Sequence, residues 1–336
     1  MMKLIHRVIA CSFGLAALAA QAQSLIVDTA AVEQAQRAGA IVWDARSAAD
    51  YAGGHIPGAV NMGAASDLFR DPNREDPPSS AVAAQLFGNA GMDIVKRDVV
   101  VYTTKGDPFA YYAARMLEYY GGRHGKVYHG GIEDWKAAGL PLATQPTRLP
   151  PIALKLDTDR VGTLWTNDVI ERVRAGNAQI LDTRTVKEFA GEDVRAIRGG
   201  HIPGAINIPY EANWKDPDTP AKFAAKQVNS KDGMALKSRD ELTTLYAKLD
   251  PTKETVVYCQ SGVRASETAA VLRDLGFSKV KLYDPSWLGY AGVLTAPAGN
   301  EVFVNVGALN GQIGALQQRL RQVEGELAKL QPKPAQ

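Results

Sequence analysis

Short apolar runs alternate with longer segments of helix-forming residues along most of the chain. The runs are rich in Val, Ile and Tyr and are typical of buried strands, whereas the longer segments carry Ala, Glu, Arg and Leu at helical spacing. Such alternation predicts a parallel sheet covered by helices on both faces, an α/β fold. The predicted strands lie at 41–44, 99–102, 180–182 and 255–258, and the predicted helices at 31–38, 110–120, 166–175 and 264–275.

The same order of signals occurs twice. An apolar run ends in Asp44-Ala45-Arg46 and again in Asp182-Thr183-Arg184, and Gly-His-Ile-Pro-Gly-Ala follows at 54–59 and at 200–205. In each copy a further strand then enters a Gly-containing loop and a helix. The offset between the copies grows along the chain, so the second copy carries insertions. The pattern predicts two domains of one ancestry.

The stretch 144–151, TQPTRLPP, divides the copies, and its prolines predict a stiff extended linker. We expect one domain at 23–146 and the other at 152–298. Each contains a polar irregular excursion, 66–80 in the first and 214–237 in the second. These excursions are expected at the surface, where they would shape a cleft.

Beyond Pro297 the pattern becomes a heptad repeat, which predicts an amphipathic or coiled-coil helix over 302–331. Arg319 and Glu324 then fall at g and e positions, where they would pair between parallel helices of a homo-oligomer. The alternative is a helix that folds back onto its own domain, and several glycines weaken the helix. The seam residues are Val306, Leu309, Ile313, Leu316, Leu320, Val323, Leu327 and Leu330.

Residues 1–22 resemble a secretory signal, with a basic start, an apolar run at 8–20 and the small-x-small site Ala20-Gln21-Ala22. The run is too short and too rich in Ala to span a membrane. We therefore expect a periplasmic or secreted protein. Cleavage before a lipidated Cys11 is the alternative, although the apolar stretch before Cys11 is very short.

Charge and cysteine content narrow the class further. Of the 38 Lys and Arg residues, Lys3 and Arg7 belong to the signal, and the remainder balance the 36 Asp and Glu residues. No basic field therefore favours nucleic acid as a partner. Removal of the signal leaves Cys259 as the one thiol, so no intrachain disulfide can form. An unpaired thiol in an exported protein is reactive or buried.

Cys259 follows the strand 255–258 and begins a loop that enters the helix 264–275, which Gly276 ends. In an open α/β sheet this corner lies at the carboxyl edge, where ligands bind and backbone N–H groups converge. The helix dipole and Arg264 favour a thiolate, which makes Cys259 a candidate nucleophile. A small buried core cysteine is the alternative. The other loop residues are Gln260, Ser261, Gly262 and Val263.

These features together resemble the rhodanese sulfurtransferases, the thiosulfate and 3-mercaptopyruvate sulfurtransferase type with two tandem domains of which the C-terminal one is active. The resemblance covers 25–298. It implies two rhodanese-like domains, each with a mainly parallel sheet and helices on both faces. It also implies that Cys259 carries sulfur as a persulfide between a small sulfur donor and a thiol or cyanide acceptor. No cofactor is implied, and no metal-ligand spacing occurs.

The same resemblance assigns roles to other residues. The loop amides from Gln260 to Arg264 would hold the persulfide, and Arg264 would frame the loop. Arg184 occupies the position of an arginine that binds the donor anion, with Arg195 and Arg198 as weaker candidates; an ion pair between Arg184 and Glu188 is the alternative. Asp-Pro-Ser-Trp at 284–287 resembles the segment that closes these sites, with Pro285 where Gly is expected.

The first copy has Thr103 where the second has Cys259, so the first domain is expected to be catalytically silent and to wall the cleft. Asp182 and His201 have equivalents in the first copy, Asp44 and His55. Because the first copy lacks the cysteine, these residues are expected to have structural roles. Trp135 and Tyr128 are expected in the core.

Loop length separates the chain from phosphatases and arsenate reductases of the same fold, which the resemblance gives as Cys-x5-Arg. Cys259 to Arg264 is Cys-x4-Arg, one residue shorter, and favours sulfur. Neutral Gln260 and Ser261 followed by Arg264 form an intermediate pattern, from which we expect thiosulfate as donor. 3-Mercaptopyruvate is the alternative donor. A non-enzymatic module that carries sulfur for a partner is the alternative function.

Overall fold

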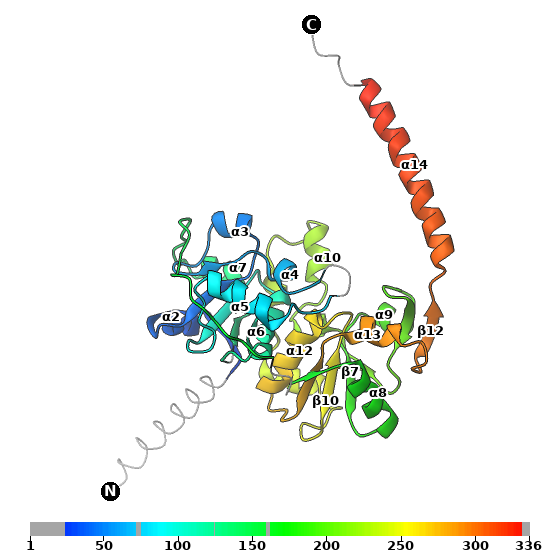
Figure 1. Ribbon diagram of the computed structural model, residues 1–336, viewed down its shortest axis with the longest axis horizontal. Helices are drawn as coiled ribbons and strands as arrows, with labels where there is room; N and C mark the ends of the chain where they lie inside the picture. The colour runs from blue at the N-terminus through cyan, green and yellow to red at the C-terminus, as the bar shows by residue number, and fades with distance from the viewer. Residues whose placement is uncertain (1–23, 72–74, 124, 159–161, 331–336) are drawn as a thin grey trace.

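The computed structural model describes residues 24–71, 75–123, 125–158 and 162–330 (Figure 1). The predicted signal segment lies outside these residues. The chain forms two α/β domains that lie side by side, followed by a long C-terminal helix that projects away from both. None of the described helices is long and apolar enough to cross a membrane.

The first domain is built on a five-stranded sheet in the order β1-β5-β4-β2-β3, and every pair of neighbours is parallel. Its strands are β1 (Ile26–Val27), β2 (Ile41–Asp44), β3 (Val60–Asn61), β4 (Val99–Tyr102) and β5 (Gly125–Tyr128). Its helices are α2 (Thr29–Arg37), α3 (Ala48–Ala52), α4 (Ala65–Leu68), α5 (Ser80–Asn89), α6 (Phe109–Tyr119) and α7 (Gly131–Ala137).

The second domain repeats this design, with a parallel sheet in the order β6-β11-β10-β7-β9. Its strands are β6 (Thr163–Leu164), β7 (Gln179–Asp182), β9 (Ile206–Asn207), β10 (Thr255–Tyr258) and β11 (Val280–Tyr283), and a separate antiparallel pair joins β8 (Arg198–His201) to β12 (Gly299–Phe303). Its helices are α8 (Thr166–Ala175), α9 (Val186–Ala190), α10 (Thr219–Ala224), α11 (Arg239–Leu245), α12 (Val263–Asp274) and α13 (Ser286–Gly292), with short 3-10 turns η1 (Tyr210–Asn213) and η2 (Asp232–Met234).

Alternating side chains of the central strands point to opposite faces of each sheet, as strand geometry requires. On β10, Val256 and Tyr258 pack with α8 and α13, whereas Val257 packs with α11 and α12. On β4, Val99 and Val101 face α5 and α6. Both faces of each sheet are therefore apolar, which explains the near-continuous apolar runs in the sequence.

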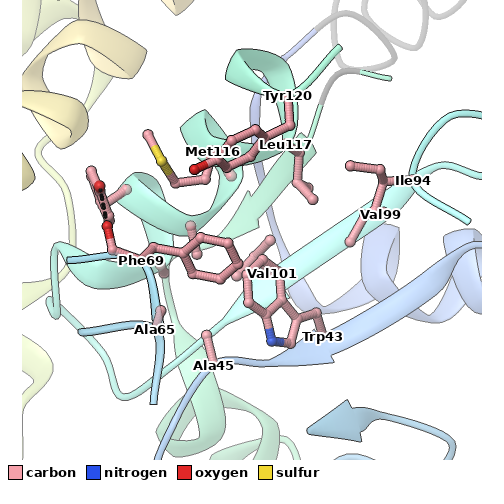
Figure 2. Close-up of a cluster of buried hydrophobic side chains, with 14 of the residues drawn as sticks. Trp43, Ala45, Ala65, Phe69, Ile94, Val99, Val101, Met116, Leu117 and Tyr120 are labelled. Atoms are coloured by element: carbon pink, nitrogen blue, oxygen red, sulfur yellow. Dashed lines mark hydrogen bonds between the residues drawn. The ribbon is translucent and has the colours of Figure 1, made fainter. Parts of the chain in front are cut away.

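Aromatic side chains fill the core beneath α5 and α6 (Figure 2). Phe69 points towards Trp43 at 5.7 Å between ring centroids, and Phe87 lies at the same distance from Trp43. All three are fully buried. Phe69 belongs to the predicted excursion 66–80, so this excursion is fixed to the core at its start.

The two domains meet mainly through α6 and α12, the helices that follow the equivalent loops of the two copies. Val263 and Ala270 of α12 are buried in the core cluster of the first domain. Arg273 on α12 also pairs with Glu118 on α6 at 3.1 Å. The interface is thus formed by equivalent elements of the repeat.

The predicted sheet and helix types are confirmed, and two boundaries are corrected. The start of the expected second domain, just after the predicted linker 144–151, packs on the first domain instead: Leu156 is buried in the core cluster of the first domain, and the Ile152 N–H donates to the Gly88 carbonyl at 3.0 Å. The C-terminal helix α14 spans Val306–Leu330 instead of 302–331, because Val302 and Phe303 pair with β8 in strand β12. Residue 331 lies outside the described residues.

Helix α14 does not fold back onto its domain in this structure. The apolar seam residues from Val306 to Leu327 are between 43% and 68% exposed. Figure 1 shows the helix extending away from the domains. The predicted seam is therefore present on one helix and is uncovered in a single chain.

We expect Phe87→Ala to lower the free energy of unfolding by about 3–5 kcal/mol, because it removes a fully buried ring from a closely packed aromatic cluster. Phe223→Ala on α10 is the matched control. Phe223 is 44% exposed, and its loss should cost less than about 1 kcal/mol. Urea denaturation followed by tryptophan fluorescence measures both, and equal losses would contradict the burial argument.

Candidate active site

The loop that begins at Cys259 is a sharp corner between β10 and α12. Gly262 caps α12 in the left-handed region, with φ of 86°. A Cβ at this position would lie 2.9 Å from the carbonyl oxygen of Asp284, which is too close for any other residue. Glycine is therefore required both by the backbone conformation and by the approach of the neighbouring chain.

The segment 284–287 holds the start of the loop from the side, as the sequence predicts. The Cys259 N–H donates to the Ser286 Oγ at 3.1 Å, and the Trp287 N–H donates to the Cys259 carbonyl at 3.0 Å. Pro285 caps α13 in a helical conformation, and the positive φ of 50° falls on Ser286. Proline is thus accommodated, and the backbone of Cys259 is fixed on both sides.

The remaining amides of the loop are free to bind a ligand. Within the described part of the chain, the backbone N–H groups of residues 260–265 have no protein acceptor. They lie at the N-terminal end of α12, where the helix dipole favours a negative charge. The loop therefore offers several N–H donors to an anion beside Cys259.

Cys259 is 1% exposed and lies in the wall of a cavity of about 820 Å³. Both domains contribute to this cavity, which agrees with the expectation that the first domain walls the cleft. The second domain supplies Cys259, Gln260, Ser261, Val263 and Arg264 with Arg195, Tyr210 and Glu211, and the first supplies Ser66, Asp67, Arg70, Asp71, Glu75, Pro108 and Phe109.

Arg264 frames the loop through a bidentate ion pair with Glu188 of α9, at 2.7 and 2.8 Å. Burial raises the pKa of Glu188, but the hydrogen bonds and charge of Arg264 and the Thr185 N–H outweigh it and lower the pKa to about 2. Burial lowers the pKa of Arg264, but Glu188 and the Cys259 sulfur raise it by more than burial lowers it. The pKa of Arg264 is therefore raised above its ordinary value. The charge of Arg264 is thus largely neutralised by Glu188.

The assignment of Arg184 to substrate binding is corrected by its surroundings. Its guanidinium is fully buried, pairs with Asp182 and donates to the Gly200 carbonyl at 2.7 Å. It also packs on Trp287, at 4.7 Å from the ring centroid. Arg184 does not line the cavity, and it does not pair with Glu188. Its role is to fix the end of β7.

Arg198 is likewise buried away from the cavity, because it donates to the backbone carbonyls of Ala291, Ala296, Tyr290 and Val293. Arg195 differs. Its side chain is 54% exposed, lies at the cavity rim and contacts Glu188 at 3.4 Å. Of the three arginines proposed from the sequence, Arg195 alone reaches the site.

Asp182 and His201 occupy the structural positions expected from the repeat. His201 stacks on Phe189 with ring centroids 3.7 Å apart, and His55 stacks on Tyr51 at 3.6 Å in the first copy. Asp44 pairs with Arg46 as Asp182 pairs with Arg184. The predicted core roles of Trp135 and Tyr128 also agree with their burial.

The Thr103 loop of the first domain is covered by the excursion 214–237 of the second. Lys105 pairs with Asp232 at 3.0 Å, and the His129 Nε2 donates to the Met234 carbonyl at 2.8 Å. Gly106 leaves space for the Met234 side chain, which a Cβ would overlap. The loop equivalent to the cysteine loop is therefore filled by protein. Burial lowers the pKa of His129 to about 4, so this histidine is neutral.

Three site residues escaped the sequence analysis: Arg70, Glu188 as the partner of Arg264, and Glu211. Arg70 and Glu211 each follow an apolar or aromatic residue in an irregular stretch, so no periodicity marked them. Burial raises the pKa of Glu211, whose Oε2 has no hydrogen-bond partner within the described residues. No group of three or more metal-ligating side chains occurs among the described residues.

Fold and site together define a two-domain α/β protein with one cysteine loop at a sheet edge. Residues 28–138 and 166–292 match the family described as rhodanese-like domain. The chain belongs to the rhodanese family, and the sulfurtransferase class expected from the sequence is confirmed.

The relatives point the same way. The chain is 32% identical over 260 residues to the thiosulfate sulfurtransferase of Corynebacterium glutamicum, covering 73% of this chain and 79% of that protein. It is 34% identical over 262 residues to the sulfur carrier protein TtuD of Thermus thermophilus, covering 74% and 86%. The 3-mercaptopyruvate sulfurtransferase of Leishmania major shares the fold, with a TM-score of 0.65 at 24% identity over 82% of this chain and 76% of that one.

We expect Glu188→Gln to lower the free energy of unfolding by about 2–3 kcal/mol at pH 7 and by progressively less at lower pH. The pKa of Glu188 is about 2, below its ordinary value of 4.5, so its ion pair stabilises the fold above pH 4.5. This contribution is lost as the pH falls towards 2. Urea denaturation between pH 7 and pH 3 measures the difference, with Glu171→Gln, an exposed carboxylate, as control. A difference that stays constant with pH would contradict the assignment.

Proposed function

We propose that the protein is an exported sulfurtransferase that moves sulfane sulfur from thiosulfate to a thiophilic acceptor through a persulfide on Cys259. The observation that carries this proposal is the position of Cys259 in the wall of the interdomain cavity, beside backbone N–H groups that lack acceptors among the described residues. A persulfide anion is stabilised by such donors. It needs no general base, and no histidine is among the described residues that line the cavity.

The chemistry balances with Cys259 alone as the covalent group. The Cys259 thiolate attacks the outer sulfur of thiosulfate, a new S–S bond forms, and the S–S bond of the donor breaks. Sulfite leaves with the bonding electron pair. The acceptor, cyanide or a thiolate, then attacks the terminal sulfur of the Cys259 persulfide, takes it as thiocyanate or as a new persulfide, and restores the thiolate.

The loop residues bind and orient in this scheme. The amides of Gln260, Ser261, Gly262 and Val263 with that of Arg264 face the charge that passes between thiolate and persulfide. Arg264 is held by Glu188 and fixes the shape of the loop. The first domain is catalytically silent because Thr103 cannot hold sulfur as a persulfide and because Met234 fills its loop.

Two observations bear on the choice between thiosulfate and 3-mercaptopyruvate as donor: the names of the relatives and the neutral side chains of the loop. Several curated relatives are named thiosulfate sulfurtransferases, and a relative in fold is a 3-mercaptopyruvate sulfurtransferase. Neutral Gln260 and Ser261 permit either small anion. Thiosulfate is the donor that we favour, and 3-mercaptopyruvate is the alternative. Measuring persulfide formation on Cys259 with each donor in turn would distinguish them.

A sulfur carrier is the second candidate function, favoured by the similarity to a protein named as a sulfur carrier and by the uncovered helix α14. Such a module would accept one sulfur on Cys259 and hand it to a partner protein instead of turning over small donors. Stoichiometric persulfide formation with little release of sulfite in repeated cycles would favour it over the enzyme.

We extend the proposal to location and assembly. The signal-like residues 1–22 support export to the periplasm or beyond, and sequencing the N-terminus of the natural protein tests it. The exposed heptad seam of α14 supports pairing with the same helix of a second chain, because its apolar residues repeat every three and four positions.

We expect wild-type protein to release sulfite from thiosulfate with cyanide as acceptor, and Cys259→Ser to lose this activity entirely. Intact mass after thiosulfate treatment should show one added sulfur on the peptide that contains Cys259. Thr103→Ala, the equivalent position of the silent domain, should keep full activity. Sulfite release by Cys259→Ser would contradict the proposed mechanism.

For assembly, we expect the double variant Leu316→Glu and Leu320→Glu to convert an oligomer to a monomer, because two charges would enter the apolar seam. Gln318→Glu lies outside the seam and should leave the oligomer intact. Light scattering coupled to size exclusion measures the mass of each. A wild-type monomer, or an oligomer that survives the double change, would rule out assembly through α14.

A further inference from the structure

Arg70 of the silent first domain is, among the described residues, the cation of the cavity wall that has buried hydrogen-bonding groups without a partner. Its side chain is 7% exposed. The Nη1 group donates to the Glu75 carbonyl, but the Nε and Nη2 groups have no hydrogen-bond partner among the described residues. A buried guanidinium with unsatisfied N–H groups is costly unless a ligand completes it.

The unused groups form one edge of the guanidinium. Nε and Nη2 lie side by side, which is the arrangement that binds two oxygens of a carboxylate or sulfonate at once. Asp284 is the closest carboxylate, but its Oδ1 is 3.8 Å from Nη2, beyond hydrogen-bond distance. That oxygen also lacks a hydrogen-bond partner among the described residues. Asp284 balances the charge without occupying the edge.

The first domain holds Arg70 in place before any ligand arrives. The preceding residue, Phe69, is buried against Trp43, and its carbonyl accepts from the Tyr112 hydroxyl at 2.9 Å. The ring of Tyr112 lies under the guanidinium, 4.1 Å from Arg70 Cζ to the centroid. Figure 2 shows Phe69 within this aromatic cluster. Little side-chain freedom is therefore lost when an anion binds.

The position of Arg70 is beside the cysteine loop. A Cβ built on Gly262 would lie 3.1 Å from Arg70 Nη2, and both Arg70 and Cys259 line the same cavity. The other two arginines of the cavity, Arg195 and Arg264, both contact Glu188. Four acidic side chains also line the cavity, namely Asp67, Asp71, Glu75 and Glu211. An anionic donor thus needs a specific cation rather than a generally basic cleft.

From this geometry we infer that Arg70 binds the anionic group of the sulfur donor, the sulfonate end of thiosulfate or the carboxylate of a mercapto acid, and aims its sulfur at Cys259. The inference rests on the proposed function for the identity of the donor. Recognition of the donor then comes from the first domain and the chemistry from the second. The site is complete only across the domain interface.

The first experiment measures persulfide formation on wild-type protein, Arg70→Ala and Arg70→Gln as thiosulfate or 3-mercaptopyruvate is varied. Loss of a charged two-point contact should raise the half-saturating donor concentration about tenfold to a hundredfold. Arg115→Ala is the matched control, because Arg115 is a buried interdomain arginine outside this cavity. Its half-saturating concentration should not change. Melting temperatures confirm that each variant is folded.

The second experiment does not depend on sulfur transfer. Iodoacetate and iodoacetamide alkylate the Cys259 thiolate alike, and only iodoacetate carries a carboxylate. Arg70→Ala should slow iodoacetate about tenfold relative to iodoacetamide, whereas Arg115→Ala should leave the ratio unchanged.

The two experiments separate the two proposals. Failure of wild-type protein to form a persulfide would overturn the proposed function, and the alkylation ratio would still decide the role of Arg70. Half-saturation within about twofold of wild type, together with an unchanged alkylation ratio, would overturn the role of Arg70.

Discussion

The packing of α6 against α12 brings the two halves of the site together. These helices follow the equivalent loops of the two copies, so their contact brings both loops to one interface. Each excursion then crosses to the other domain. The excursion 66–80 carries Arg70 to the Cys259 loop, and 214–237 carries Met234 to the Thr103 loop. Each domain thus covers the loop of the other, but the outcomes differ. The Cys259 loop gains a cavity wall, whereas the Thr103 loop is filled by Met234.

The arginines of the cavity wall differ in how far a neighbouring carboxylate compensates their charge. The charge of Arg264 is compensated by Glu188, whose pKa of about 2 keeps its carboxylate ionised at neutral pH. Arg70 has only a distant partner in Asp284. Unsatisfied groups therefore concentrate at the Arg70 edge and at the loop amides. The proposed donor, a small anion with a soft sulfur at one end and oxygens at the other, would satisfy both.

Local signals in the sequence predicted most of the fold and the centre of the site. The strands Val99–Tyr102 and Thr255–Tyr258, the helix Thr166–Ala175 and the closing segment at 284–287 follow from residues adjacent in the chain. Arg70 was missed because its place beside the Cys259 loop depends on the contact between domains, which no spacing in the sequence encodes. Arg184 was assigned to substrate binding, although the internal repeat already indicated a structural role. The silent copy has the same pair, Arg46 with Asp44, so the arginine could have been judged structural on the argument applied to Asp182.

On our proposal, the first domain carries no sulfur chemistry of its own and supplies an anion-binding arginine to the cavity. On the catalytic domain, the cavity arginines Arg264 and Arg195 both crowd around the one carboxylate of Glu188. An arginine that arrives from the opposite side, with its ring partner Tyr112 and its anchor Phe69 buried in another core, avoids that crowding. Its position is set by the aromatic core of the first domain, so under this proposal mutations in that core should affect donor binding as well as stability. In the proposed arrangement, donor recognition and sulfur transfer are therefore divided between the two domains at their interface.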